Sequence, residues 1–273
     1  MSSVPSRESV RRYYDSVTTR KLRDFVDGNA RVERAWETIR SRAPLEPQRT
    51  LEIGCGVGQL SWQMRRHWPH SEVTALDISP RSIELARSLF GPERIEFVTG
   101  RLEEVDLAPT FDLITMVDVY EHIAQPDRAP LHAALGRLMS PTSRLVLTFP
   151  TPRFLRWLRE HDPANIQPID EAIEIQTIEA LARDTRTSIL LYAEQSVWHN
   201  GDYAHAVLGR EPDLGHVPRK EPQSRRAMVA RSLGDAGRVV ASRILPWQRN
   251  DPRAQRLTLL RERLGYTYDD IAR

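Results

Sequence analysis

A loop with three glycines constrains this chain more than any other feature of its sequence. The loop covers residues 54–58 (GCGVG) and directly follows a short apolar run, residues 50–53, that has the composition of a buried strand. Glycine lets a backbone turn tightly and approach a ligand without a clash from a Cβ atom. Asp77 ends the next apolar run, 19 positions after Gly58, where a carboxylate can accept hydrogen bonds from both hydroxyls of a ribose. The pattern predicts a strand–loop–helix unit that binds a nucleoside.

From residue 49 onward, short apolar runs alternate with amphipathic segments, which is typical of βαβ units and a parallel sheet. We expect parallel strands at residues 50–53, 72–77, 95–99, 111–117 and 143–149, and helices at 58–68, 80–90 and 127–139. After residue 150 we expect helical segments at 153–162 and 170–183, then strands at 188–196 and 203–208 around a hairpin turn at 199–202. The fold class is therefore α/β.

The glycine loop departs from the dinucleotide fingerprint G-x-G-x-x-G, which requires a glycine at position 59, where this chain has Gln59. Its pattern is G-x-G-x-G, with Glu52 two positions before the first glycine. At these positions the chain resembles class I S-adenosylmethionine-dependent methyltransferases, in which such a loop holds the methionine end of the cofactor. That end carries no pyrophosphate, so it does not require a phosphate-binding helix terminus. Five parallel strands followed by an antiparallel pair also match that family rather than dehydrogenases.

Two further segments resemble the same family. Residues 111–123 (FDLITMVDVYEHI) are similar to its fourth-strand motif, and residues 138–150 (LMSPTSRLVLTFP) to its fifth strand and the turn before it. The resemblance spans about residues 49–150 and implies S-adenosylmethionine as the cofactor, bound by a Rossmann-like seven-stranded sheet. It implies cofactor contacts from Tyr14, Glu52, Gly54, Cys55, Gly56, Gly58, Asp77, Ile78, Leu102, Val117 and Asp118.

Two of these contacts have alternatives. Tyr14 and its neighbours at residues 13–15 form either a flap over the cofactor or an ordinary buried aromatic pair. Before Leu102, the chain has Arg101 where the family commonly has an aspartate that contacts the adenine amine. That contact is therefore either lost or supplied by Glu103.

The chain divides into three parts. We expect residues 1–48 as a helical N-terminal cap, residues 49–209 as the cofactor-binding domain with a helical lid insert at 150–176, and residues 210–273 as a basic C-terminal extension. Residues 209–273 contain 14 Arg and Lys against 8 Asp and Glu. An amphipathic helix expected at 225–247 either packs against the domain or a second copy of the chain, forming a homo-oligomer, or makes a peripheral contact with an anionic membrane.

The composition is that of an ordinary globular protein, with 40% hydrophobic and 28% charged residues and a mean hydropathy of −0.49. No apolar run approaches the roughly 18 residues of a membrane span. The N-terminus lacks the apolar core of a secretory signal, so we expect a cytoplasmic location. The one cysteine, Cys55, excludes an internal disulfide, and a net charge of +2 gives no indication of nucleic-acid binding.

Ligands of parallel α/β sheets bind at the carboxyl ends of the strands, so candidate catalytic residues must lie there. His199, in the turn between the last two strands, is the first candidate for acceptor contact or general base, and Asp202 in the same turn is a further catalytic candidate. The alternative for His199 is a turn residue without function. His122, in the Glu-His ending of the fourth-strand motif, is the other candidate, against a structural role at a helix start. His199, Asp202 and His205 offer too few ligands for a metal ion, so none is predicted.

Residues 151–205 resemble bacterial methyltransferases of glycan and glycolipid assembly. This implies O-methylation of a hydroxyl on a saccharide or glycosylated metabolite, which needs an aligned acceptor and removal of the hydroxyl proton. Two alternatives stay open: O- or C-methylation of a small aromatic or isoprenoid acceptor, and a non-catalytic cofactor-binding subunit. The chain has no Asn/Asp-Pro-Pro-Tyr/Phe run and no Pro-Cys pair, which disfavours the enzymes that methylate DNA amino groups, glutamine or cytosine carbon-5.

Overall fold

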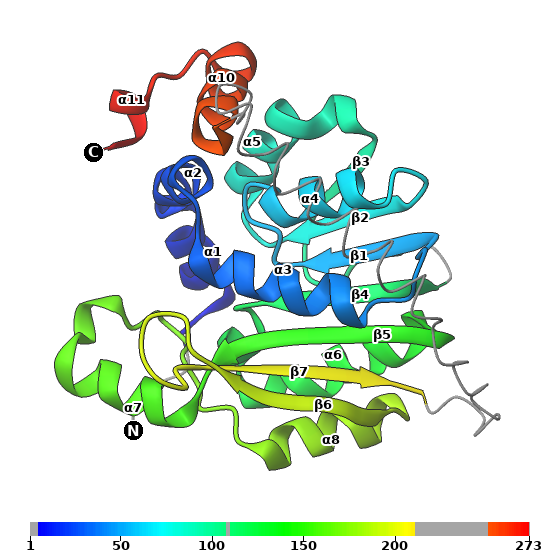
Figure 1. Ribbon diagram of the computed structural model, residues 1–273. Coiled ribbons are helices and arrows are strands. Elements are labelled where there is room, and N and C mark those ends of the chain that lie inside the picture. The colour runs from blue at the N-terminus through cyan, green and yellow to red at the C-terminus, as the bar shows by residue number, and fades with distance from the viewer. Residues whose placement is uncertain (1–4, 108–109, 211–250, 273) are drawn as a thin grey trace, which may run out of the picture.

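The computed structural model describes residues 5–107, 110–210 and 251–272. Its strands are β1 (Arg49–Ile53), β2 (Glu72–Asp77), β3 (Ile95–Thr99), β4 (Phe111–Val117), β5 (Met139–Pro150), β6 (Ser188–Gln195) and β7 (Tyr203–Gly209). They form one seven-stranded sheet in the order β3-β2-β1-β4-β5-β7-β6 (Figure 1). Neighbouring strands pair in parallel, except that β7 is antiparallel to both β5 and β6. The predicted methyltransferase sheet is thereby confirmed.

Helices cover both faces of this sheet (Figure 1). The helices are α1 (Arg7–Ser16), α2 (Thr18–Asp27), α3 (Ala30–Arg42), α4 (Gln59–His67), α5 (Pro80–Phe90), α6 (Gln125–Leu138), α7 (Pro152–His161), α8 (Ile175–Thr185), α10 (Pro252–Leu264) and α11 (Tyr268–Ala272), with 3-10 turns η1 (Gly91–Glu93), η2 (Tyr120–His122) and η3 (Pro163–Asn165). One hydrophobic cluster joins the sheet to α3, α4 and α5, and a second joins it to α6 and α8. Strands that are buried on both faces appear in the sequence as continuous apolar runs, which is why their positions could be predicted.

The predicted elements differ from the observed ones mainly at their ends. β5 begins at 139 rather than at 143, and the second lid helix, expected from 170, begins at Ile175. The backbone before α8 makes other hydrogen bonds. The N–H of Gln167 donates to Oδ2 of Asp170 at 2.8 Å, and the N–H of Glu171 donates to the carbonyl of Glu121 at 2.9 Å. These bonds hold the segment against η2 instead of allowing a helical turn.

The predicted N-terminal cap consists of α1, α2 and α3. Figure 1 shows α1 and α2 at the same end of the sheet as the lid helix α7, which is the end where the parallel strands finish. The C-terminal helices α10 and α11 pack on α2 and α5. Asp27, at the end of α2, bonds to both helices: it accepts hydrogen bonds from Nε of Arg253 in α10 at 2.9 Å and from the hydroxyl of Tyr268 in α11 at 2.7 Å. The last part of the basic extension therefore packs against the domain.

The helix expected at 225–247 lies outside the described residues. Within the described ranges, none of the helices has the length and apolar character needed to span a membrane.

Candidate active site

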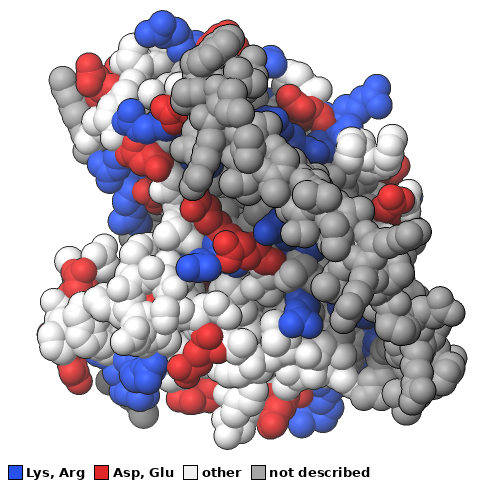
Figure 2. All heavy atoms as spheres, viewed as in Figure 1, with Lys and Arg blue, Asp and Glu red and all other residues white. Residues whose placement is uncertain are grey.

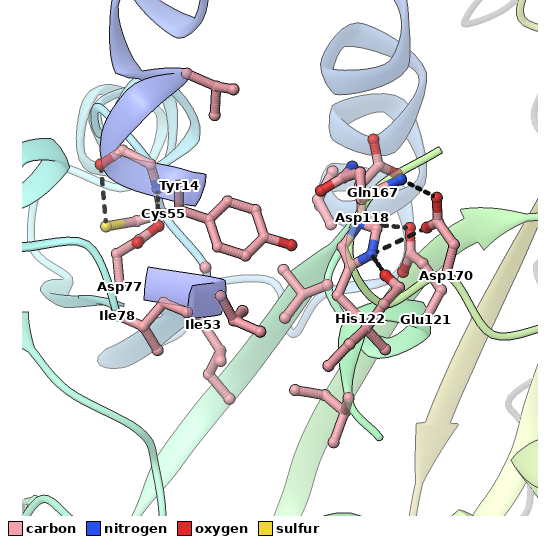
Figure 3. Close-up of a pocket in the computed structure, with 18 of the residues that line it drawn as sticks. Tyr14, Ile53, Cys55, Asp77, Ile78, Asp118, Glu121, His122, Gln167 and Asp170 are labelled. Carbon is pink, nitrogen blue, oxygen red and sulfur yellow. Dashed lines mark hydrogen bonds and ion pairs between the residues drawn. The ribbon is translucent and has the colours of Figure 1, made fainter. Parts of the chain in front are cut away.

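A cavity of about 980 Å³ opens where the parallel strands end. That volume is at the upper end of the roughly 300–1,000 Å³ typical of ligand pockets, so it has room for a nucleoside and a second molecule. In Figure 2 the surface is notched between the part that carries α1 and α2 and the part that carries α7. Figure 3 shows two groups of lining side chains, which we call the Asp77 end and the His122 end. The Asp77 end contains Tyr14, Cys55, Asp77 and Ile78, and the His122 end contains Asp118, Glu121, His122, Gln167 and Asp170.

The glycine loop forms the wall of the Asp77 end. The N–H groups of Gly54 and Cys55 both donate to the carbonyl of Leu76, at 2.7 and 3.0 Å, so the loop is tied to the neighbouring strand. Gly54 has a φ of +78°, and a Cβ atom there would overlap Cγ2 of Val119. Only glycine fits both the backbone conformation and the space at this position.

Replacing Gly54 by alanine is expected to lower the free energy of unfolding by about 2–4 kcal/mol, since left-handed strain and steric overlap add. Gly265 gives a matched control, because its φ is +69° and nothing lies within 4 Å of an added Cβ atom. Gly265→Ala should therefore cost only the backbone strain, about 1–2 kcal/mol. Urea unfolding of both variants measures the difference, and equal losses would contradict the overlap with Val119.

Asp77 is buried at the end of β2 and accepts two backbone hydrogen bonds. Oδ2 accepts from the N–H of Gly56 at 2.7 Å, and Oδ1 accepts from the N–H of Ser79 at 2.8 Å. Each carboxylate oxygen has two lone pairs, so one remains on each oxygen for a hydroxyl of a ligand. The ammonium of Lys21, from α2, lies 3.9 Å from Oδ2. The contacts fit the predicted role of Asp77 as a ribose acceptor.

Other groups at the Asp77 end fit the rest of the expected cofactor. The amide Nε2 of Gln59 is buried and, among the described residues, has no hydrogen-bond partner, so it is a donor available to a carboxylate. Ile78 and Leu102 give the cavity an apolar wall suited to a flat base. Tyr14 lies in the cavity, with the Lys21 ammonium 5.2 Å from its ring centre, which supports the flap interpretation.

Two acidic residues near this end are already engaged. Glu52 accepts a hydrogen bond from the hydroxyl of Ser61, and burial raises the pKa of Glu52 to about 7. Arg101 forms ion pairs with Glu103 and, at 3.1 Å, with Asp127. The carboxylate of Glu103 is thus held at the cavity wall by Arg101, and its contact with an adenine amine stays a prediction.

Ten of the eleven residues predicted to bind the cofactor line this cavity. They are Tyr14, Glu52, Gly54, Cys55, Gly56, Asp77, Ile78, Leu102, Val117 and Asp118. Gly58 does not line it. This glycine precedes α4 and packs against the rings of Phe90 and Phe97, so it shapes the turn from behind the loop. The expectation of a direct cofactor contact from Gly58 is corrected accordingly.

At the His122 end, Asp118 follows β4 in a left-handed conformation with a φ of 54°. Its Oδ2 lies 2.9 Å from Nη1 of Arg31, which comes from α3 of the cap. Burial raises the pKa of Asp118, although Arg31 acts in the opposite direction. The guanidinium also lies over the ring of Trp198, 5.3 Å from its centre. Arg31 therefore links the cap to the end of β4 and to the β6–β7 turn.

His122 lies in a buried group of polar side chains. Its Nδ1 is 2.6 Å from the carbonyl of Ile169 and 3.0 Å from Oδ1 of Asp170, and both oxygens come from the lid. Its Nε2 is 3.7 Å from Oε1 of Glu121. Burial alone lowers the pKa of His122, but Glu121 and Asp170 outweigh burial and raise it to about 9. Burial raises the pKa of Glu121 to about 8, against the effect of His122.

The β6–β7 turn has a different arrangement. His199 is exposed at the mouth of the cavity, where its ring lies 4.8 Å from that of Trp157. Asp202 is buried and does not line the cavity. Its two oxygens accept the N–H groups of Val197, Trp198 and His199 at 2.8 to 3.0 Å. Asp202 therefore holds the turn in shape, and the structure gives it a positioning role rather than the predicted catalytic one.

The sequence reasoning missed Lys21, Arg31, Gln167 and Asp170. Each lies on the cap or the lid and reaches the cavity only through the tertiary fold. Helical periodicity identified the cap but gave no signal that distinguishes Arg31 from the other arginines near it. Glu121 was part of a recognised motif and could have been selected from it.

Comparisons with known proteins agree with this geometry. Residues 50–142 match the family of methyltransferase domains. Residues 50–142 form a methyltransferase domain, and the chain has the fold of a methyltransferase solved with bound S-adenosylhomocysteine.

Among relatives of this methyltransferase domain, the mitochondrial ubiquinone biosynthesis O-methyltransferase of Schizosaccharomyces pombe is 35% identical over 125 residues, which is 44% of each chain. A malonyl-[acyl-carrier protein] O-methyltransferase of Acetivibrio thermocellus is 39% identical over 64 residues, or 23% of each chain. The chain thus matches less than half the length of these curated relatives. The resemblance to glycan and glycolipid methyltransferases stays a prediction.

Solved structures share the fold of the whole domain. The magnesium protoporphyrin IX methyltransferase of Synechocystis PCC 6803, with bound S-adenosylhomocysteine, superposes with a TM-score of 0.60 at 18% identity, covering 76% of this chain and 100% of that one. A TehB-like methyltransferase of Corynebacterium glutamicum gives a TM-score of 0.55 at 20% identity, covering 73% of this chain and 99% of that one.

Proposed function

We propose that the protein transfers a methyl group from S-adenosylmethionine to a hydroxyl group of a saccharide. Three buried polar atoms at the His122 end carry this proposal, because none has a hydrogen-bond partner among the described residues: Nε of Arg31, Oε2 of Glu121 and Oε1 of Gln167. A buried polar group without a partner costs about 1–3 kcal/mol, so a ligand that satisfies all three gains affinity. A hydroxyl both donates and accepts, so the neighbouring hydroxyls of one sugar ring match this mixed set.

S-adenosylmethionine supplies a methyl group that is electrophilic because it is bound to a sulfonium. The residues of the chain have to hold the cofactor and the acceptor in line and to remove the hydroxyl proton. At the Asp77 end, Asp77 would hold the ribose. Gln59 and Lys21 would bind the carboxylate of the methionine part, and Ile78 and Leu102 would enclose the adenine.

His122 is the general base in this proposal. A carbonyl oxygen can only accept, so Nδ1 must donate to Ile169, which leaves Nε2 as the nitrogen that can take the hydroxyl proton. Asp170 orients the ring through the same Nδ1 and is a positioning residue. Glu121 raises the pKa of His122, and His122 lowers that of Glu121, so the two groups together set the pH at which the base becomes available. His199, at the mouth, contacts the acceptor instead.

A small aromatic acceptor of quinone biosynthesis is the second candidate. The match with ubiquinone biosynthesis O-methyltransferases supports it, over less than half of each chain. The same base and the same in-line geometry would serve such an acceptor. A single aromatic hydroxyl would satisfy fewer of the three partnerless atoms than a sugar ring, which is why we favour the saccharide.

The test is transfer of a tritiated methyl group from S-adenosylmethionine to a panel of methyl glycosides, oligosaccharides, phenols and prenylated phenols. We expect kcat/KM for the best saccharide to exceed that for the best phenol by at least about tenfold, since each satisfied buried group contributes about 1 kcal/mol or more. Product analysis should locate the new methyl on a sugar oxygen. Transfer to phenols alone would overturn the saccharide assignment and leave the methyltransferase activity in place.

A further inference from the structure

A continuous chain of aromatic rings leads from the His122 end of the cavity to the surface. Between ring centres, Tyr203 lies 6.0 Å from Trp198 and 6.3 Å from Phe154, and Phe154 lies 5.8 Å from Trp157. His199 lies against two of these rings, 5.5 Å from Phe154 and 4.8 Å from Trp157. All five residues line the cavity. The rings come from α7, from the β6–β7 turn and, for Tyr203, from the start of β7, so separate elements build one aromatic surface.

The outer rings of this chain are exposed. Trp157 is 38% and Trp198 is 55% exposed, and they are the exposed tryptophans of the described residues. Figure 2 shows mainly uncharged atoms on the part of the surface that carries α7, with charged groups at its margins. Exposed apolar surface beside a cavity marks a binding surface more often than chance packing does.

Both tryptophans are held in fixed orientations. Trp198 has the guanidinium of Arg31 over its ring, and Trp157 is nearly parallel to Phe154, with an angle of 10° between the ring planes. Arg153 adds to this rigidity, because its Nη2 donates to the carbonyls of Asn200 and Gly201 at 2.9 and 3.0 Å and so ties α7 to the turn. Rings that are already ordered lose little entropy when a ligand packs on them.

We propose that Trp157 and Trp198 form an outer subsite for the sugar units next to the one that is methylated, so that the acceptor is an oligosaccharide or a longer glycan. This inference rests on the proposed function. A pyranose ring has a flat face of C–H groups that packs on an aromatic ring, and a rim of hydroxyls that needs hydrogen-bonding partners.

The polar groups between the rings favour a glycan over an isoprenoid chain. The imidazole of His161 stacks on the ring of Trp157, with 4.9 Å between ring centres and 9° between the planes, and that of His199 lies 4.8 Å away at a tilt of 46°. Asn165 also lines the cavity. Nδ1 of His161 bonds to the carbonyl of Trp157, and the amide nitrogen of Asn165 donates to Asp162. Hydrocarbon packed over these side chains would separate their remaining polar atoms from water without replacing the hydrogen bonds, which costs free energy, whereas hydroxyls replace them.

The test is a series of acceptors of increasing length: the methyl glycoside of the best monosaccharide from the panel, and its di-, tri- and tetrasaccharides. For the wild type we expect KM to fall by about tenfold from the monosaccharide to the trisaccharide, the size expected of one aromatic stacking contact or more. Trp157→Ala should raise the trisaccharide KM by about tenfold while kcat and the monosaccharide KM stay within about twofold. Trp198→Ala also removes the ring that packs on Arg31, so it should raise the trisaccharide KM by at least the same factor, with no expectation of an unchanged monosaccharide KM. Tyr266→Ala is the matched control, because Tyr266 is 39% exposed and does not line the cavity.

A second measurement does not depend on how well the alanine variants fold. Wild-type protein labelled with 5-fluorotryptophan is titrated with the trisaccharide in the presence of S-adenosylhomocysteine and followed by fluorine NMR. The signals of Trp157 and Trp198, assigned with the Trp→Phe variants, should shift, while that of the cap residue Trp36 should not.

The outcomes separate the two proposals. If sugars are methylated but KM is independent of chain length and the two fluorine signals do not shift, the outer subsite is wrong and the proposed function stands. If no sugar is methylated, the proposed function is wrong, and the outer subsite, which rests on it, is wrong with it. If prenylated phenols rather than oligosaccharides shift the two signals, the aromatic surface binds an isoprenoid and the inference is overturned.

Discussion

Replacing Asp77 by alanine is expected to weaken S-adenosylhomocysteine binding by at least about a hundredfold, which calorimetry would register as a loss of the binding isotherm. The two oxygens of Asp77 keep one lone pair each for the ribose hydroxyls after accepting the N–H groups of Gly56 and Ser79. Hydrogen bonds to charged groups contribute about 1.5–3 kcal/mol each, so losing two of them corresponds to a factor of roughly 10² to 10⁴. The variant also loses two backbone contacts that shape the loop.

Asp112 provides the control for those backbone contacts. Its Oδ2 accepts the N–H groups of Gln48 and Arg49 at 2.8 and 3.1 Å, at the opposite end of the sheet from the cavity. Asp112→Ala should therefore lower the unfolding free energy without changing S-adenosylhomocysteine affinity by more than about threefold. If Asp77→Ala bound S-adenosylhomocysteine within twofold of wild type, the ribose role would be refuted.

The Asp77 end could be predicted from the sequence because its parts are local. The glycine loop and Asp77 follow two adjacent parallel strands, and the pairing of Ile53 with Leu76 brings both to the same edge. The spacing along the chain therefore fixes the distance in space. Gly58 is the exception, because a glycine pattern does not reveal whether a given member faces the ligand or the helix behind it.

The His122 end could be predicted only in part, because its residues come from distant segments. Arg31 on the cap contacts Asp118 through the packing of α3, and Asp170 on the lid contacts His122 through the 167–171 segment. No local sequence pattern encodes either contact. Asp202 shows that a local pattern can also suggest a role that the residue does not have. An acidic residue in a turn has the same sequence signature whether it faces a substrate or accepts the N–H groups of its own turn, as it does here.

Replacing His122 by alanine is expected to lower kcat by roughly 10² to 10⁴, the range contributed by a positioned general base. S-adenosylhomocysteine affinity should change little, because the groups proposed to hold the cofactor lie at the Asp77 end. His70→Ala is the control, since His70 is exposed and does not line the cavity. An unchanged kcat for His122→Ala would remove the base assignment, and His199 would become the remaining histidine candidate.

If His122 is the general base, the methyl-transfer rate of the wild type should depend on pH in a predictable direction. A base acts only when it is deprotonated, and the pKa values of Glu121 and His122 are raised to about 8 and about 9. The rate should therefore fall as the pH drops through this window and level off above it, with a midpoint that belongs to the pair rather than to either residue. Asp170→Asn removes one carboxylate that raises the pKa of His122, so its midpoint should move to lower pH while His122 remains in place. A merely structural Asp170 would lower the rate at every pH and leave the midpoint where it was.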